Sequence, residues 1–358
     1  MKDLNRSASA ALLAAREQLS EAVVERKYAQ EPEFWERYGA MGRVRSLEDA
    51  NYHFGYLAEA LSASDPLLLL DYLKWVKVLF QGLGFPDEVL TTTLTCMLEV
   101  SREQLPPDLQ PVVAEYLEAG IRNLPQLPSA IPSFLREEAP LTPLAKQYLE
   151  ALLRGERNTA SRLILDAVAR GTGVKDIYLQ VFQSTQHEIG RLWQTNRLSV
   201  AQEHYCTAAT QLIMSQLYPY IFATEKIGRR IVATSVGGEL HEIGVRMVAD
   251  FFEMEGWDTY YLGANTPTES ILLTIAERDA DILAISATMT FHVRRVEELI
   301  ARVRNQSKPI AILAGGYPFN VSSGLWQRVG ADGYAGNAEE ALSAADRLPG
   351  GSYRLSEK

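Results

Sequence analysis

Apolar and polar positions have the spacing of α-helices in the first third of the chain. In residues 1–124 apolar residues recur every three to four positions, and strand-like alternation is nearly absent. Helix-breaking stretches such as Gly82–Pro86 and Pro106-Pro107 divide this part into about five or six predicted helices. The pattern therefore predicts an all-α first domain over residues 1–124.

The following segment is rich in proline and predicts a linker over residues 125–143. Its prolines stand at positions 125, 128, 132, 140 and 143. Proline fixes φ and lacks an N–H group, so this density excludes a continuous helix. Helical spacing then returns in pieces at residues 144–154, 157–169, 174–193 and 199–223. Together they predict a four-helix bundle over residues 144–225.

In the last third of the chain the hydrophobic pattern changes from helical spacing to short strands that alternate with helices. Residues 230–236 are typical of a short buried strand that leads into Gly237-Gly238 and then into a helix. Further strands are predicted at residues 258–262, 282–286, 310–314 and 333–335. Strands that alternate with helices predict a parallel, doubly wound, Rossmann-like α/β domain over residues 228–350.

Composition and charge limit the possible class and cellular location of the protein. The 358 residues are 47% hydrophobic and 22% charged, as in globular proteins of two or three domains. No apolar stretch reaches the roughly 20 residues that cross a bilayer. The polar N-terminus resembles no secretory signal, and Cys96 and Cys206 fit no disulfide or zinc pattern. The net charge of −10 disfavours nucleic-acid binding. We therefore expect a cytoplasmic protein without a membrane span.

The candidate chemistry lies in the loop after the first predicted strand. This loop contains Glu239, His241 and Gly244. Ligands of open α/β sheets bind beyond the carboxyl ends of the strands, so His241 is well placed to ligate a metal. A carboxylate two residues earlier can hydrogen-bond the far ring nitrogen and fix the tautomer, a role we predict for Glu239. A histidine that only satisfies its own hydrogen bonds is the alternative.

Two later segments favour the ligand hypothesis. Ser286 and Thr288 close the third predicted strand, and Gly315-Gly316 closes the fourth. The carboxyl ends of parallel strands meet at one edge of the sheet, so all of these residues are expected around His241. A generic nucleotide or flavin site remains the alternative for this edge.

The three segments resemble the D-x-H-x-x-G, S-x-L and G-G signature of cobalamin-binding domains. The matching segments are Glu239-Leu240-His241-x-x-Gly244, Ser286-x-Thr288 and Gly315-Gly316. Glu stands here where Asp is commoner, and Thr where Leu is commoner. The resemblance implies that His241 binds cobalt in place of dimethylbenzimidazole. It also implies that the nucleotide tail enters a slot formed by the glycines and by Ser286 and Thr288, with Leu240 beside the ligand.

The preceding bundle resembles the helical cap of light-sensing cobalamin repressors. Their W-x9-E-H motif is matched by Trp193, Glu203 and His204. The resemblance implies that Trp193 packs beside the 5′-deoxyadenosyl group and that Glu203 binds its ribose, which favours adenosylcobalamin. One departure is Gln194, because the repressors have a second histidine directly after the tryptophan. Without the adjoining domain, a core tryptophan and a solvated Glu-His pair would be the simpler interpretation.

The order of the domains resembles that of photocobilins, in which a globin-like helical domain holds a bilin beside a cobalamin unit. The resemblance implies biliverdin as a second chromophore in residues 1–124. His53 would then hydrogen-bond the bilin, and Cys96 would attach it as a thioether. Packing in the helical core is the alternative for both residues.

The leading hypothesis is a cytoplasmic light sensor and signalling protein without catalytic activity of its own. Light would break the cobalt–carbon bond and change an interface with another protomer or an unidentified partner protein. The alternative is a corrinoid methyl-carrier protein that serves separate methyltransferases. A cobalamin mutase subunit is a further alternative, although no substrate barrel is visible in this sequence.

Overall fold

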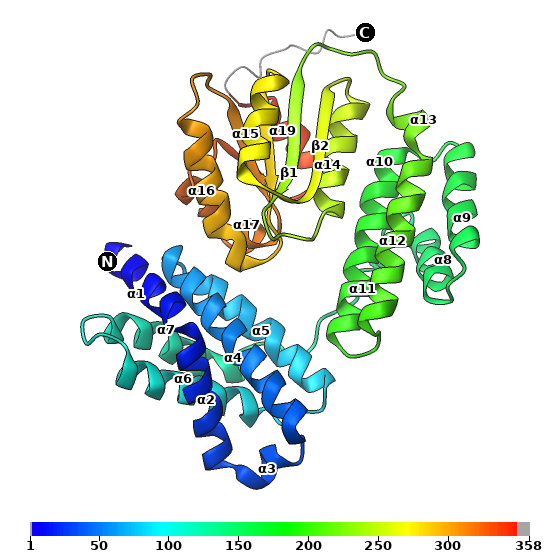
Figure 1. The fold of residues 1–358 in the computed structure, drawn as a ribbon. Helices are drawn as coiled ribbons and strands as arrows, with labels where there is room; N and C mark the ends of the chain where they lie inside the picture. Colours follow the sequence, from blue (N-terminus) through cyan, green and yellow to red (C-terminus); the bar gives the residue numbers. More distant parts are fainter. Residues whose placement is uncertain (1, 349–358) are drawn as a thin grey trace.

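The computed structural model describes residues 2–348, and its N-terminal region is entirely helical (Figure 1). Seven α-helices precede residue 124, which is more than the five or six predicted. The additional break comes from Pro32, which begins a short separate helix. The helices are α1 Lys2–Ala14, α2 Arg16–Gln30, α3 Pro32–Glu36, α4 Gly39–Ser62, α5 Pro66–Gly82, α6 Glu88–Gln104 and α7 Gln110–Asn123.

A second group of helices follows the proline-rich segment. The helix that contains Trp193 runs without interruption from α10 through a π-helical turn at Ile177–Gln183 into α11. Its neighbour α12 ends at Gln216, earlier than predicted, because Pro219 starts the short α13. The bounds are α8 Thr142–Leu153, α9 Arg157–Ala169, α10 Val174–Asp176, α11 Ser184–Gln194, α12 Val200–Gln216 and α13 Tyr218–Ile221. The four-helix-bundle geometry of this cap and the domain boundaries stay predictions.

The last part of the described chain contains a five-stranded parallel sheet with the order β2-β1-β3-β4-β5. The parallel Rossmann-like sheet is thus confirmed. Its strands are β1 Arg230–Val236, β2 Asp258–Thr266, β3 Ile282–Ser286, β4 Ala311–Gly315 and β5 Gly333–Ala335. The helices between them are α14 Ile243–Met254, α15 Thr268–Glu277, α16 Val293–Arg304, α17 Tyr317–Val321, α18 Leu325–Arg328 and α19 Ala338–Ala345.

Alternate residues of the strands enter different cores. In β1, Ile231 and Ala233 pack with α14 and α19, whereas Val232 packs with α15 and α16 on the opposite face. Successive side chains of a strand point to opposite faces, so this alternation buries both sides of the sheet. Since β1 lies between β2 and β3, the chain reverses its winding direction there, and the loop after β1 lies at that switch point.

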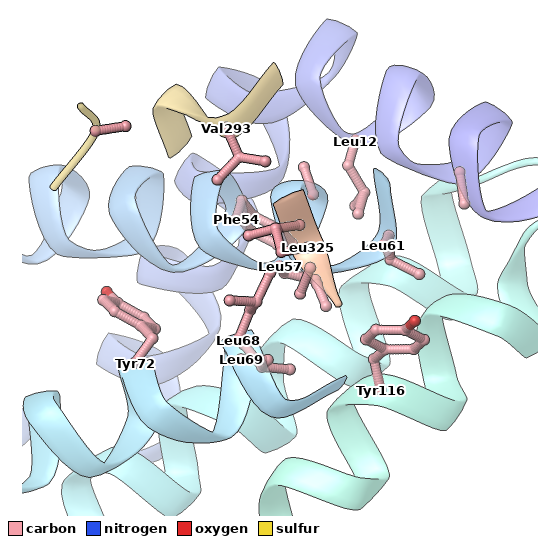
Figure 2. Packing of buried hydrophobic residues seen from close by; sticks show 14 of the residues in the cluster. Leu12, Phe54, Leu57, Leu61, Leu68, Leu69, Tyr72, Tyr116, Val293 and Leu325 are labelled. Atoms are coloured by element: carbon pink, nitrogen blue, oxygen red, sulfur yellow. The ribbon is translucent and has the colours of Figure 1, made fainter. Parts of the chain in front are cut away.

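The N-terminal helices and the sheet domain share one apolar core (Figure 2). Leu57 and Leu61 of α4 lie in the same cluster as Val293 of α16 and Leu325 of α18. The cap has a separate core, which it extends onto the sheet domain through Phe251 of α14. Among residues 2–348, no helix combines the length and apolar content that crossing a bilayer requires.

Candidate functional site

The loop after β1 turns sharply at Gly238, where φ is +84°. Only glycine adopts this region readily, and a Cβ here would also lie 2.1 Å from the guanidinium of Arg295. Asn265, near the end of β2, fixes the loop from the other side, because its side chain accepts a hydrogen bond from the Gly238 N–H at 2.6 Å. The backbone thus places Glu239 and His241 at the carboxyl edge of the sheet.

Glu239 is completely buried and accepts hydrogen bonds at both carboxylate oxygens. Oε1 lies 2.6 Å from Nδ1 of His241. Oε2 accepts the backbone N–H groups of Thr288 and Met289 at 2.8 and 3.0 Å and lies 2.9 Å from Nδ1 of His292. Burial alone would raise the pKa of Glu239, but these hydrogen bonds outweigh it and hold the pKa well below its ordinary value.

His241 is oriented by this carboxylate and remains accessible. Its side chain is 58% exposed, although the Glu239 beside it is buried. Nδ1–H of His241 donates its hydrogen bond to Glu239, which leaves Nε2 as the ring nitrogen available to a ligand. The same hydrogen bond raises the pKa of His241 against the opposing effect of burial. A fixed tautomer with a free Nε2 is the state that a metal-binding histidine requires.

His292 was missed by the sequence analysis. It is buried in the turn before α16 and shares the Glu239 carboxylate with His241. Its position four residues after Thr288, beyond the end of β3, was the available signal. That signal was weak because the contact joins residues 53 positions apart.

The glycines at the end of β4 are required by the protein backbone itself. Gly316 has φ +101°, and a Cβ there would lie 2.0 Å from the carbonyl oxygen of Ala287. At Gly315 a Cβ would lie 3.0 Å from the carbonyl oxygen of Ala335. Ser286 pairs with Gly315 in register, so the two strand ends lie side by side at the edge that also holds Glu239.

Gly244 differs from these glycines. It lies in the first turn of α14 with an ordinary φ, and no atom lies within 4 Å of where its Cβ would be. The open space there and the free Nε2 of His241 fit a large ligand at this edge. Among residues 2–348, no group of three or more His, Cys, Asp or Glu side chains could hold a metal ion. A metal at His241 would therefore need other ligands, such as those of a macrocycle.

The structure brings part of the cap motif toward this edge. The charge of Glu203, on α12, contributes to raising the pKa of His241, after the larger effects of Glu239 and of burial. Glu203 also accepts a hydrogen bond from Thr207 at 2.8 Å, and His204 beside it is exposed. The Trp193 ring lies 5.9 Å from the Trp75 ring of α5, a contact with the N-terminal region that the sequence did not predict. Leu240, next to His241, is 71% exposed.

Hydrogen bonds also join the cap to the His241 loop. Glu242 accepts from the side chain of Gln211 on α12 at 2.9 Å, and its other oxygen accepts from Tyr261 of β2 at 3.1 Å. Arg246 of α14 donates to the backbone oxygen of Gln211 at 3.0 Å. The residue next to His241 thus connects cap and sheet.

The two residues predicted to contact a bilin lie in the helical core. His53 is 3% exposed, its Nδ1 lies 2.7 Å from the Tyr72 hydroxyl, and burial lowers its pKa to about 3. Cys96 is fully buried, and burial raises the pKa of its thiol to about 11. Both side chains therefore belong to the helical core of this structure, and their contacts with a bilin stay predictions.

Comparison with known proteins identifies the ligand class. Residues 229–346 match the B12 binding domain family, and residues 144–218 match a second B12 binding domain family. The chain is 26% identical over 217 residues to dimethylamine corrinoid protein 1 of Methanosarcina acetivorans, an alignment that covers 57% of this chain and 99% of that protein. It is 24% identical over 214 residues to a corrinoid protein of Desulfitobacterium hafniense, with coverages of 58% and 98%.

A solved structure has a similar fold. The monomethylamine corrinoid protein of Methanosarcina barkeri matches with a TM-score of 0.50 and 23% identity, covering 56% of this chain and 96% of that one. The matches show that the chain contains cobalamin-binding domains in residues 144–218 and 229–346. They overturn the light-sensor hypothesis, because these relatives are corrinoid proteins, as the alternative requires. Biliverdin receives no support from them. Residues 1–143 lie outside both family matches.

Proposed function

We propose that this chain is a corrinoid methyl carrier that serves separate methyltransferases. The proposal is supported by corrinoid relatives that this chain aligns with over nearly their full length. The observation that carries the site is the buried Glu239, which accepts a hydrogen bond from Nδ1 of an exposed His241 and leaves Nε2 free, so that His241 would hold the cobalt. When bound, the cobalamin supplies a cobalt centre that accepts and gives up a methyl group.

The residues of the chain bind and orient in this function. Glu239 sets the tautomer and direction of His241 and keeps its own negative charge behind the ring. Gly244 leaves room beside His241, and Ser286, Thr288 and the Gly315-Gly316 turn form the edge that would take the nucleotide tail. Leu240 is the exposed apolar contact next to the ligand histidine.

We assign the cap residues Trp193, Glu203 and His204 to the cobalamin site on the side of the cap. A carrier must expose the cobalt to a partner enzyme, so the cap would have to move away during transfer. A carrier also gains nothing from contacts that only an adenosyl group makes. We therefore expect methylcobalamin and adenosylcobalamin to bind with dissociation constants within a factor of about ten, equivalent to about 1.4 kcal/mol. Adenosylcobalamin bound more than about a hundredfold tighter would contradict the carrier function.

The test of the site is titration of the full chain with hydroxocobalamin, followed by absorbance. In His241→Ala the protein loses the cobalt ligand, so affinity should fall at least about tenfold, and the band shift of the bound cobalamin should disappear. The matched control is His187→Ala on α11, where the ring packs 5.2 Å from Phe134 instead of in the His241 loop. Unchanged spectra and affinity in His241→Ala would refute the assignment.

A further inference from the structure

Helix α5 of the N-terminal region spans two parts of the proposed site. Asp71 and Trp75 are four residues apart and therefore lie on the same side of the helix. Asp71 accepts a hydrogen bond from the hydroxyl of Tyr317 at 3.1 Å, and Tyr317 directly follows Gly316. Trp75 lies against Trp193 of the cap, with ring centroids 5.9 Å apart. One side of α5 thus extends from the glycine turn of the sheet to the tryptophan of the cap.

Helix α4 reaches the residues behind His241. Tyr56 stacks on Tyr72 of α5 with centroids 3.7 Å apart and planes 10° from parallel, which fixes its ring. Its ring centroid lies 5.6 Å from that of Phe291 in an edge-to-face arrangement, and the next residue is the His292 that shares the Glu239 carboxylate.

These two helices are held on the sheet domain by contacts that do not involve the cap. Leu57 and Leu61 enter the core that also contains Val293 and Leu325 (Figure 2). Asp65, the N-cap residue of α5, accepts hydrogen bonds from Ser322 and Arg328, both at 2.5 Å. The positions of Tyr56 and Trp75 relative to the Gly316 turn are therefore set by packing within the described chain.

Tyr56, Asp71 and Trp75 are each partly exposed, although the contacts on either side of them are buried or anchored. A corrin carries methyl groups and amide side chains around its rim. Aromatic faces pack against methyl groups, and a carboxylate accepts hydrogen bonds from amide N–H groups. We propose that the N-terminal helical region forms part of the corrinoid site, with Tyr56 and Trp75 against the corrin rim and Asp71 bound to one of its amides. This inference rests on the proposed function.

The first experiment measures the affinity of full-length variants for hydroxocobalamin and for cobinamide, which has the corrin but no nucleotide. Trp75→Ala and Tyr56→Ala should each weaken both ligands by about tenfold, because the lost contact is with the corrin. Trp75→Phe should restore most of the affinity. The control is Tyr38→Ala, an aromatic residue of the same region that packs against Phe34 and Phe85.

The second experiment does not depend on truncated side chains. Wild-type chain labelled with 5-fluorotryptophan should show a shifted ¹⁹F resonance for Trp75 when hydroxocobalamin is added, with Trp75→Phe used to assign the signal. An unshifted Trp75 resonance, or unaltered affinity in both alanine variants, would overturn this inference. If His241→Ala still loses binding in that case, the carrier site stands and only the role of the N-terminal region is wrong. If His241→Ala also binds normally, the proposed function fails as well.

Discussion

Two buried glutamates in neighbouring regions, Glu239 in the site loop and Glu59 on α4, have pKa values that are shifted in opposite directions. Glu239 is fully buried and Glu59 is 3% exposed, so burial is similar, and it is the largest effect on the pKa of both. The carboxylate of Glu239 accepts hydrogen bonds at both oxygens, and its pKa is depressed. Oε2 of Glu59 has no partner among the described residues, and burial raises the pKa of Glu59 to about 7.

The difference shows that hydrogen-bond donors, and not depth, decide the charge of a buried carboxyl group here. In the site loop, two imidazoles and backbone N–H groups compensate the charge. On α4, attraction to Arg294 is opposed by repulsion from Glu297 and Glu298, and burial dominates. The low pKa of Glu239 keeps it ionised beside His241, whereas burial raises the pKa of Glu59, at the interface between α4 and α16, to about 7.

The largest expected effect is at Glu239. In Glu239→Gln one acceptor oxygen remains, and the amide NH2 faces groups that themselves donate. We expect the free energy of unfolding to fall by about 3–5 kcal/mol, as when one partner of a buried ionic network is removed. Urea unfolding of the ligand-free chain at neutral pH measures this. A loss below about 1 kcal/mol would mean that the carboxylate does not organise the loop.

The second expected effect is an increase in stability, on substitution of Glu59. The pKa of Glu59 is raised from its ordinary value of 4.5 to about 7 in the folded chain, so the folded state binds more protons than the unfolded state between these values. Stability contributed by the neutral form is therefore complete below about pH 4.5 and lost as pH rises through about 7. Glu59→Gln should remove this loss and stabilise the chain at pH 8 by on the order of 3 kcal/mol.

The control for Glu59→Gln is Glu277→Gln, at an exposed position on α15 that does not contribute to the raised pKa of Glu59. We expect this control to leave the pH dependence of unfolding between pH 4.5 and 8 nearly unchanged. If Glu59→Gln instead destabilises the chain at pH 8, the carboxylate of Glu59 is ionised and compensated. The contrast between the two glutamates would then be wrong.

A smaller effect separates the two kinds of glycine in the site. Gly316→Ala places a Cβ against the Ala287 carbonyl at a positive φ, so the free energy of unfolding should fall by about 2 kcal/mol. Gly244→Ala meets no protein atom and replaces glycine in a helix, so it should stabilise the ligand-free chain by up to about 1 kcal/mol. The same variant should bind hydroxocobalamin more weakly. Thermal unfolding with and without hydroxocobalamin distinguishes stability from binding, and unaltered affinity in Gly244→Ala would place the ligand away from α14.

The sequence predicted the parts of this molecule that depend on local pattern. Alternating strands and helices predicted the parallel sheet, and the loop after its first strand predicted the Glu239–His241 contact. The sequence did not reveal His292 on the same carboxylate or the hydrogen bond between Gln211 and Glu242. These contacts join residues 53 and 31 positions apart, and no periodicity records which side chains a fold brings together at such separations.

The same limit explains the wrong prediction of a light sensor. The corrinoid relatives overturn it, and the cap motif did not reveal that Trp193 lies against Trp75 of the N-terminal region. His53 and Cys96 carry the residue types of a bilin site, yet helical packing buries both. Residue type and spacing predicted the contact between Glu239 and His241, because these residues are only two positions apart. The sequence pattern did not predict side-chain contacts between residues of different domains.

The most direct test of the account is the identity of the atom below cobalt. The full chain is loaded with cob(II)alamin, and its electron paramagnetic resonance spectrum is compared between unlabelled protein and protein labelled with ¹⁵N only in histidine. If Nε2 of His241 is the axial ligand, the triplet splitting from ¹⁴N becomes a doublet on labelling, and His241→Ala loses that doublet. A triplet that persists in the labelled protein would show that dimethylbenzimidazole still holds the cobalt, and it would contradict the site proposed for His241.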